Sequence, residues 1–140
     1  MIVVALIGML AAIAVPVMRH QQQRVQNGRF VSDLRIFAQA FETYATRNGK
    51  WPADASPGAV PAGMSGELRD GAWTVAQTSI GGQWDWDYKS LSFTACIGIH
   101  PVNLPVAQMQ EIDRLIDDGN LATGSFRSSG SNYYVYILQP

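Results

Sequence analysis

The chain opens with Met1-Ile-Val-Val-Ala-Leu-Ile-Gly-Met-Leu-Ala-Ala-Ile-Ala-Val-Pro-Val-Met18, a stretch without a charged side chain. As a helix, the run from Ile2 to Met18 would be about 26 Å long at ~1.5 Å per residue, close to the roughly 30 Å hydrocarbon core of a bilayer. A helix that is apolar on all sides lies in lipid or against other helices. A secretory signal peptide is an alternative, because Ala12-Ile13-Ala14 fits a cleavage site, but the stretch lacks a positively charged start. We therefore predict a transmembrane segment over residues 1–18, which lies in lipid, against other helices, or in both.

Residues 19–48 predict an amphipathic continuation of the same helix. Apolar side chains recur there at spacings of three and four, which places them on one face. Asn48-Gly49 then predicts the end of the helix, because glycine readily adopts the left-handed conformation of a C-terminal cap. We expect this face to pack on residues 49–140, a small globular domain. The predicted helix–sheet core comprises Phe30, Leu34, Phe37, Phe41, Tyr44 and Trp51.

Alternation of apolar and polar residues predicts a sheet in the globular domain. The expected strands are Ala72 to Thr78, Gln83 to Tyr88 and Leu91 to Ile99, with Gly81-Gly82 as a hairpin turn between the first two. Asp85 and Asp87 would be exposed charges on the polar face of their strand. A short helix is expected from Asn103 or Pro105 to Gly119, and a last hairpin joins residues 125–127 to residues 132–138. The predicted class is α+β, with the long helix covering one face of a small antiparallel sheet.

Two stretches carry a resemblance to a known family. Ile2 to Pro16 resembles the N-terminal helix of type IV pilins and type II secretion pseudopilins, which reads I-V-V-A-I-I-G-I-L-A-A-I-A-I-P. The exit from the helix, Phe41 to Pro52, is similar to the pseudopilin pattern of a tyrosine, Asn-Gly and an aromatic-Pro pair. The resemblance implies the pilin-like fold, and a chain that assembles instead of catalysing. Its assembly helix would use Ile2, Val3, Leu6, Gly8, Leu10, Ile13 and Pro16, with a kink or an unwound segment at Pro16.

The resemblance also implies a setting. The chain would be a structural subunit of a type IV pilus-like filament or of a type II secretion pseudopilus. It would cross the bacterial inner membrane once with a periplasmic globular domain, and then join a periplasmic or extracellular filament. Expected partners are copies of itself or other pilin-like subunits, and the secretion or pilus assembly machinery. The single cysteine, Cys96, excludes an intrachain disulfide and mildly favours a pseudopilin. The alternative is a monomeric, membrane-anchored periplasmic binding module.

The start of the chain conflicts with this setting. Arg19, Arg24 and Arg29 follow the apolar run, and the positive-inside rule would keep the globular domain in the cytoplasm. Family members carry a basic leader, a methylated aromatic residue and a glutamate before the matching region. We therefore expect the true start to lie upstream of Met1.

Few residues suggest chemistry. His20 and His100 are far apart and lack a catalytic motif, and Cys96 has no accompanying Cys-His signature, so we predict no enzyme and no catalytic residue. We also predict no metal or other cofactor. Calcium is a weak alternative, because Asp113 precedes a turn with three further oxygen donors, Asp117, Asp118 and Asn120. Lysine and arginine (10) nearly balance aspartate and glutamate (11) without a basic groove, so no nucleic-acid partner is expected.

Overall fold

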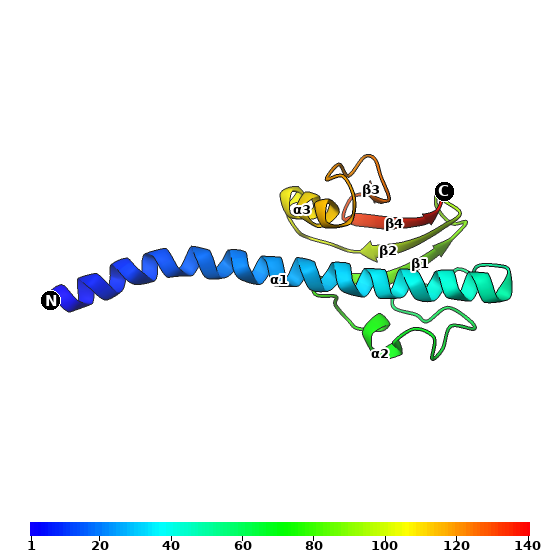
Figure 1. Ribbon diagram of the computed structural model, residues 1–140, viewed down its shortest axis with the longest axis horizontal. Helices are drawn as coiled ribbons and strands as arrows, with labels where there is room; N and C mark the ends of the chain where they lie inside the picture. The colour runs from blue at the N-terminus through cyan, green and yellow to red at the C-terminus, as the bar shows by residue number, and fades with distance from the viewer.

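A computed structural model describes residues 1–140, apart from the side chain of Asp70. Its dominant element is α1, Ile2–Asn48, which has 47 residues and is therefore about 70 Å long. The N-terminal half of α1 projects beyond the rest of the molecule, and the other half lies along the globular domain, or head (Figure 1). The helix ends at Gly49, which has a φ of 70°. The predicted long helix and its glycine cap are confirmed.

Pro16 does not unwind α1. The helix is continuous through this residue, and Figure 1 shows a gradual curve in the projecting half instead of a sharp break. Proline removes one backbone hydrogen bond and crowds the preceding turn, and a gentle bend relieves that crowding. The two alternatives expected at Pro16 are a kink and a locally unwound segment. The unwound segment is wrong for the isolated chain, and the helix bends gradually instead of kinking sharply.

The head contains one four-stranded antiparallel sheet in the order β1-β2-β4-β3. The strands are β1 Gln83–Tyr88, β2 Ala95–His100, β3 Phe126–Gly130 and β4 Tyr133–Gln139. The antiparallel sheet and its final hairpin are confirmed, although β2 begins at Ala95 and not at Leu91. Asn132, at the turn between β3 and β4, has a positive φ of 59°, a conformation that asparagine tolerates better than most residues.

Aromatic side chains join α1 to one face of the sheet. Phe30 stacks on Trp84 with ring centroids 5.1 Å apart, and Phe41 stacks on Trp86 at 3.8 Å. Trp84 and Trp86 are two residues apart on β1, so both point toward α1. The phenylalanines recur at helical spacing, so they lie on the face of α1 that meets the sheet. Leu34 and Phe37 are buried between these pairs. Tyr44 and Trp51 are half-buried at the rim.

The predicted strand from Ala72 to Thr78 is wrong. This region holds a single helical turn, α2 Asp70–Trp73, followed by an irregular segment. The free edge of β1 is already occupied, because Ala55 bridges to Trp86 and the Gly58 N–H donates to the Trp84 carbonyl at 2.8 Å. The edge of β1, beside which a hairpin partner would pair, is therefore not free for a strand over residues 72–78. Gly81 and Gly82 have positive φ as expected, but they form a turn into β1 and not a two-strand hairpin.

The remaining helix, α3 Val106–Ile116, has Met109 and Ile112 buried against the head. It ends at Ile116 with Asp117 as its C-cap, three residues before the predicted Gly119. In Figure 1, α3 lies at the end of the head that is nearest the projecting half of α1. This position places α3 beside the junction between the two halves of the long helix.

Candidate functional site

The strongest functional feature is the projecting half of α1. Every residue from Met1 to Met18 is exposed, including the predicted assembly positions Ile2, Val3, Leu6, Gly8, Leu10, Ile13 and Pro16. The most apolar window of α1 has a mean hydropathy of 2.4, and none of it is buried. By length and composition, α1 could cross a membrane. None of the described residues covers this surface, so it needs lipid or another protein.

Polar contacts fix the head to α1 just beyond the apolar half. The Gln108 side-chain amide donates to the Asn27 Oδ1 at 2.9 Å, and both side chains are buried. Gln23 donates to Glu111 at 3.1 Å, which adds a second contact between α1 and α3. Buried polar groups require paired partners, so the Asn27–Gln108 pair defines where α3 sits along α1.

The three calcium candidates hold their own loop together. The Asp117 carboxylate accepts from the Ser125 N–H. Asp118 accepts from the Asn120 N–H at 2.8 Å and from the Thr123 hydroxyl at 2.7 Å, and the hydroxyl contact is the main cause that lowers the pKa of Asp118. Asn120 Oδ1 accepts from the Ala122 N–H at 3.2 Å. These side chains therefore stabilise the turn after α3, whether or not a cation binds.

Asp113 differs from these three residues. It is fully buried on the inner face of α3, and neither carboxylate oxygen makes a hydrogen bond of normal geometry with the described residues, although Asp118 and the Gly119 backbone lie close to it. Burial first, and then the charges of Asp118 and Asp117, raise the pKa of Asp113 to about 6. A buried carboxyl without a donor either binds a proton or needs a cation. The described part of the chain has no group of three or more His, Cys, Asp or Glu residues arranged to hold a metal ion.

A second acidic cluster lies on the face of the sheet that points away from α1. Asp85 and Asp87 are nearly buried, so their expected exposure is wrong. The Tyr133 hydroxyl from β4 reaches across Gly98 and contacts both carboxylates, at 3.2 Å for Asp85 and more closely for Asp87. Burial, followed by the charge of Asp87, raises the pKa of Asp85 to about 6. The Tyr133 hydroxyl has a single proton and therefore donates to one of the two carboxylates at a time.

The thiol and the imidazoles do not form a catalytic group in the described structure. Cys96 is buried beside this acidic cluster, and burial followed by the charges of Asp87 and Asp85 raises its pKa to about 12. The thiol therefore stays protonated and unreactive. His100 meets the ring of Tyr133 edge-on at 5.4 Å, whereas His20 lies on α1 near the apolar half.

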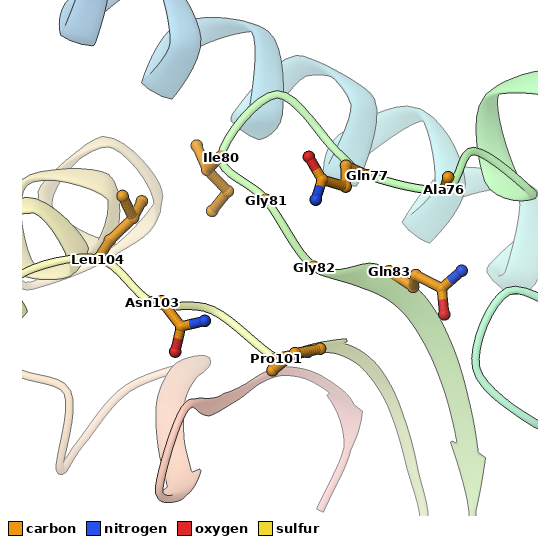
Figure 2. A pocket seen from close by; sticks show the side chains of 9 residues that line it. All are labelled: Ala76, Gln77, Ile80, Gly81, Gly82, Gln83, Pro101, Asn103 and Leu104. Atoms are coloured by element: carbon orange, nitrogen blue, oxygen red, sulfur yellow. The ribbon is translucent and has the colours of Figure 1, made fainter.

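A cleft on the head is lined by residues from two loops, 76–83 and 101–104. Its polar side chains are the amides of Gln77, Gln83 and Asn103, and none of the described residues that line it is titratable. Figure 2 shows these amide groups pointing in different directions. Ligand sites usually combine apolar walls with a few convergent polar groups. This cleft therefore offers little chemistry for a small charged ligand.

Comparisons with known proteins agree with the architecture. No protein-family model matches the sequence, and no curated protein matches it significantly. Among solved structures, the chain is similar to the major type IV pilin PilA1 from Clostridium difficile, with a TM-score of 0.57 and 16% sequence identity. The similarity covers 84% of this chain and 97% of the pilin. A long apolar-then-amphipathic helix packed on a small antiparallel sheet, with this structural match, is the fold of a type IV pilin.

Proposed function

We propose that the chain is a structural subunit of a type IV pilus-like filament or of a type II secretion pseudopilus. The subunit is held in the bacterial inner membrane by residues 1–18, with residues 49–140 in the periplasm. It then polymerises with copies of itself or with other pilin-like subunits, using the secretion or pilus assembly machinery. The observation that carries the proposal is the complete exposure of the apolar residues from Ile2 to Met18, on a helix whose other half is already packed.

Burial of these side chains supplies the driving force for polymerisation. In a filament, apolar helices replace lipid contacts by contacts with each other, which depends on close van der Waals packing between helices. Gly8 fits this role, because its position has no heavy atom within 4 Å in the single chain. A small residue there lets a neighbouring backbone approach. The secretion-pseudopilus form is slightly favoured because the chain has a single cysteine and therefore no intrachain disulfide.

A monomeric binding module anchored by the same helix is the competing function. The cleft of Figure 2 is lined by described residues without charged side chains and gives such a module little to bind a charged ligand. A monomeric module also leaves Gly8 without a partner, because any apolar residue would anchor a monomer equally well. The lack of charged side chains in this cleft also speaks against acid–base or nucleophilic catalysis there.

The test compares Gly8→Trp with Gly8→Ala in the native host. Both variants keep the segment apolar, so membrane insertion is expected to be retained. The indole would block close helix packing, while the alanine methyl group is small enough to permit it. We expect Gly8→Trp to abolish filaments in electron micrographs and intersubunit crosslinks, and Gly8→Ala to retain both. Normal filaments from Gly8→Trp, or a wild-type chain that never crosslinks to a pilin-like neighbour, would refute the assembly role.

A further inference from the structure

A groove with excess positive charge lies between α1 and α3, immediately beyond the apolar half of the long helix. Two arginines from different elements face it, Arg24 on α1 and Arg114 on α3. The other residues that matter for its chemistry are His20, Gln23, Glu111 and Leu115. None of the sequence patterns predicted this groove, because it forms only when α3 docks against α1.

The positive charge of the groove is not neutralised within the chain. Glu111 is its one carboxylate, and that group already accepts a hydrogen bond from Gln23 at 3.1 Å. Among the described residues, Arg47–Glu67 is the one salt bridge. Neither Arg24 nor Arg114 therefore makes an ion pair within this part of the chain. Guanidinium groups offer paired N–H donors that match the oxygens of a phosphate. The groove therefore suits a monovalent phosphate group.

The near end of the groove lies at the depth of the headgroup layer of a bilayer. At ~1.5 Å per residue, His20 to Asn27 lie roughly 3 to 14 Å beyond Met18 along the helix axis. The polar layer on each side of the hydrocarbon core is about 5 to 8 Å thick. If Ile2 to Met18 spans the core, the near end of the groove falls within that layer.

We propose that the groove binds the phosphate of an anionic phospholipid headgroup, an inference that rests on the membrane span of the proposed function. Arg24 and Arg114 hold the phosphate from two sides, and the His20 ring provides a further polar contact. Because the two arginines come from α1 and α3, the lipid ties the head to the helix at the membrane surface. The bound lipid thereby sets the depth and tilt of the head before assembly.

The experiment uses the full-length chain reconstituted in phosphatidylcholine vesicles with trace spin-labelled lipids. Electron paramagnetic resonance separates lipid immobilised by the protein from bulk lipid. We expect spin-labelled phosphatidylglycerol to associate on the order of fivefold more strongly than phosphatidylcholine at low salt. The double variant Arg24→Gln/Arg114→Gln should bring this ratio close to one. The matched control, Lys50→Gln/Arg69→Gln, removes the same charge from exposed positions outside the groove and should retain the ratio.

Circular dichroism melts of all variants verify that the head is folded. An unchanged ratio in Arg24→Gln/Arg114→Gln would overturn the proposal, as would an equal loss in the control pair. Loss of filaments with an unchanged lipid ratio would assign the groove to a second copy of the chain. If inorganic phosphate abolishes the preference while chloride of the same ionic strength does not, the groove is a site for free phosphate instead.

Failure of the membrane span itself has a different signature. A chain that does not insert would immobilise no spin-labelled lipid of either kind, whereas an inserted chain without the headgroup site immobilises both lipids equally. Gly8→Trp should keep the phosphatidylglycerol preference while losing filaments. The lipid site and the assembly role can therefore fail independently.

Discussion

The two halves of α1 share one backbone but have opposite relations to the rest of the molecule. The half without charged residues, Ile2 to Met18, is exposed throughout, while the half that contains Asp33 and Arg35 provides the buried stripe from Asn27 to Phe41. Hydrophobicity alone therefore does not say which part of a helix is in the core of its own chain. The spacing of apolar residues does, because only the second half has a single apolar face that a sheet can cover. The first half is apolar on all sides and is left to contact lipid or other proteins.

Truncation of the buried half should have the largest effect on the head. Phe41 is 0% exposed and stacks on Trp86, so Phe41→Ala leaves a cavity in the core. We expect the free energy of unfolding to fall by about 3 to 5 kcal/mol, measured by urea denaturation of the detergent-solubilised chain. Ile13→Ala, which truncates an exposed residue of the other half, should leave the unfolding midpoint unchanged. A large loss in Ile13→Ala would mean that the two halves are not energetically separate.

A charge in the apolar half should impair membrane insertion and leave the stability of the head unchanged. Ala11→Asp places a carboxylate near the middle of the proposed span, which costs about 2.5 to 3.5 kcal/mol in membrane insertion. We expect most of the variant to be extracted from membranes by carbonate, while the head melts at the wild-type temperature. Ala11→Leu is the control and should insert normally. A lowered melting temperature of the head in Ala11→Asp would contradict the separation of the halves.

The acidic residue inside α3 tests whether head stability depends on proton binding. Below about pH 4, Asp113 is protonated in both the folded and the unfolded chain, so it has no effect on the pH dependence. Between about pH 4 and 6, the folded state keeps a proton that the unfolded state has lost, so stability should fall as pH rises. At 1.36 kcal/mol per pKa unit, the fall is on the order of 2 to 3 kcal/mol. Asp85 has a pKa raised to about 6 as well and should add to the same trend.

The variant Asp113→Asn separates the contribution of Asp113 to the pH dependence of stability from that of Asp85. The neutral amide has nearly the same shape, so this variant should be more stable than the wild type above pH 6 and should show a shallower pH profile between pH 4 and 6. The same melts with calcium or with a chelator test the expectation that no cation is needed. A calcium-dependent increase in the wild-type melting temperature that Asp113→Asn abolishes would overturn that expectation.

The smallest expected loss of stability comes from a substitution on the outer face of the sheet, the face that points away from α1. Tyr133→Phe removes the donor that reaches Asp85 and Asp87. The loss should be about 1.5 kcal/mol at pH 7, typical of a hydrogen bond to a charged group, as measured by thermal melts. Tyr136→Phe, on the opposite face of β4, is the matched control. Equal effects of the two substitutions would show that the acidic cluster does not depend on Tyr133.

Local sequence patterns were sufficient to predict the elements whose structure depends on neighbouring residues. The long helix, its end at Gly49 and the alternation of β1 could be predicted because each is determined by residues within a short window. The strand predicted over residues 72–78 failed for the opposite reason. Whether a segment forms a strand depends on a free edge, and Ala55 and Gly58 had already taken the edge of β1.

The buried polar residues were missed for related reasons. Asp85 and Asp87 are covered by Tyr133, which is more than forty residues away in the sequence, so alternation alone indicated exposed charges. Asp113 did leave a signal, because it lies four residues after Met109 and directly follows Ile112 on the same helix. The groove between Arg24 and Arg114 left none, since its two sides come from separate elements that only docking brings together.

Three of the four tryptophans lie inside the junction between α1 and the sheet, where Trp73, Trp84 and Trp86 contact phenylalanines of the helix. The molecule therefore has a built-in optical reporter of docking. If the sheet separates from the helix during polymerisation, water reaches these indoles, their emission shifts to longer wavelength and the near-ultraviolet dichroism collapses. If the head enters the fibre as a rigid body, both spectra stay unchanged. The intrinsic tryptophans therefore distinguish separation of the sheet from rigid-body assembly without an extrinsic dye.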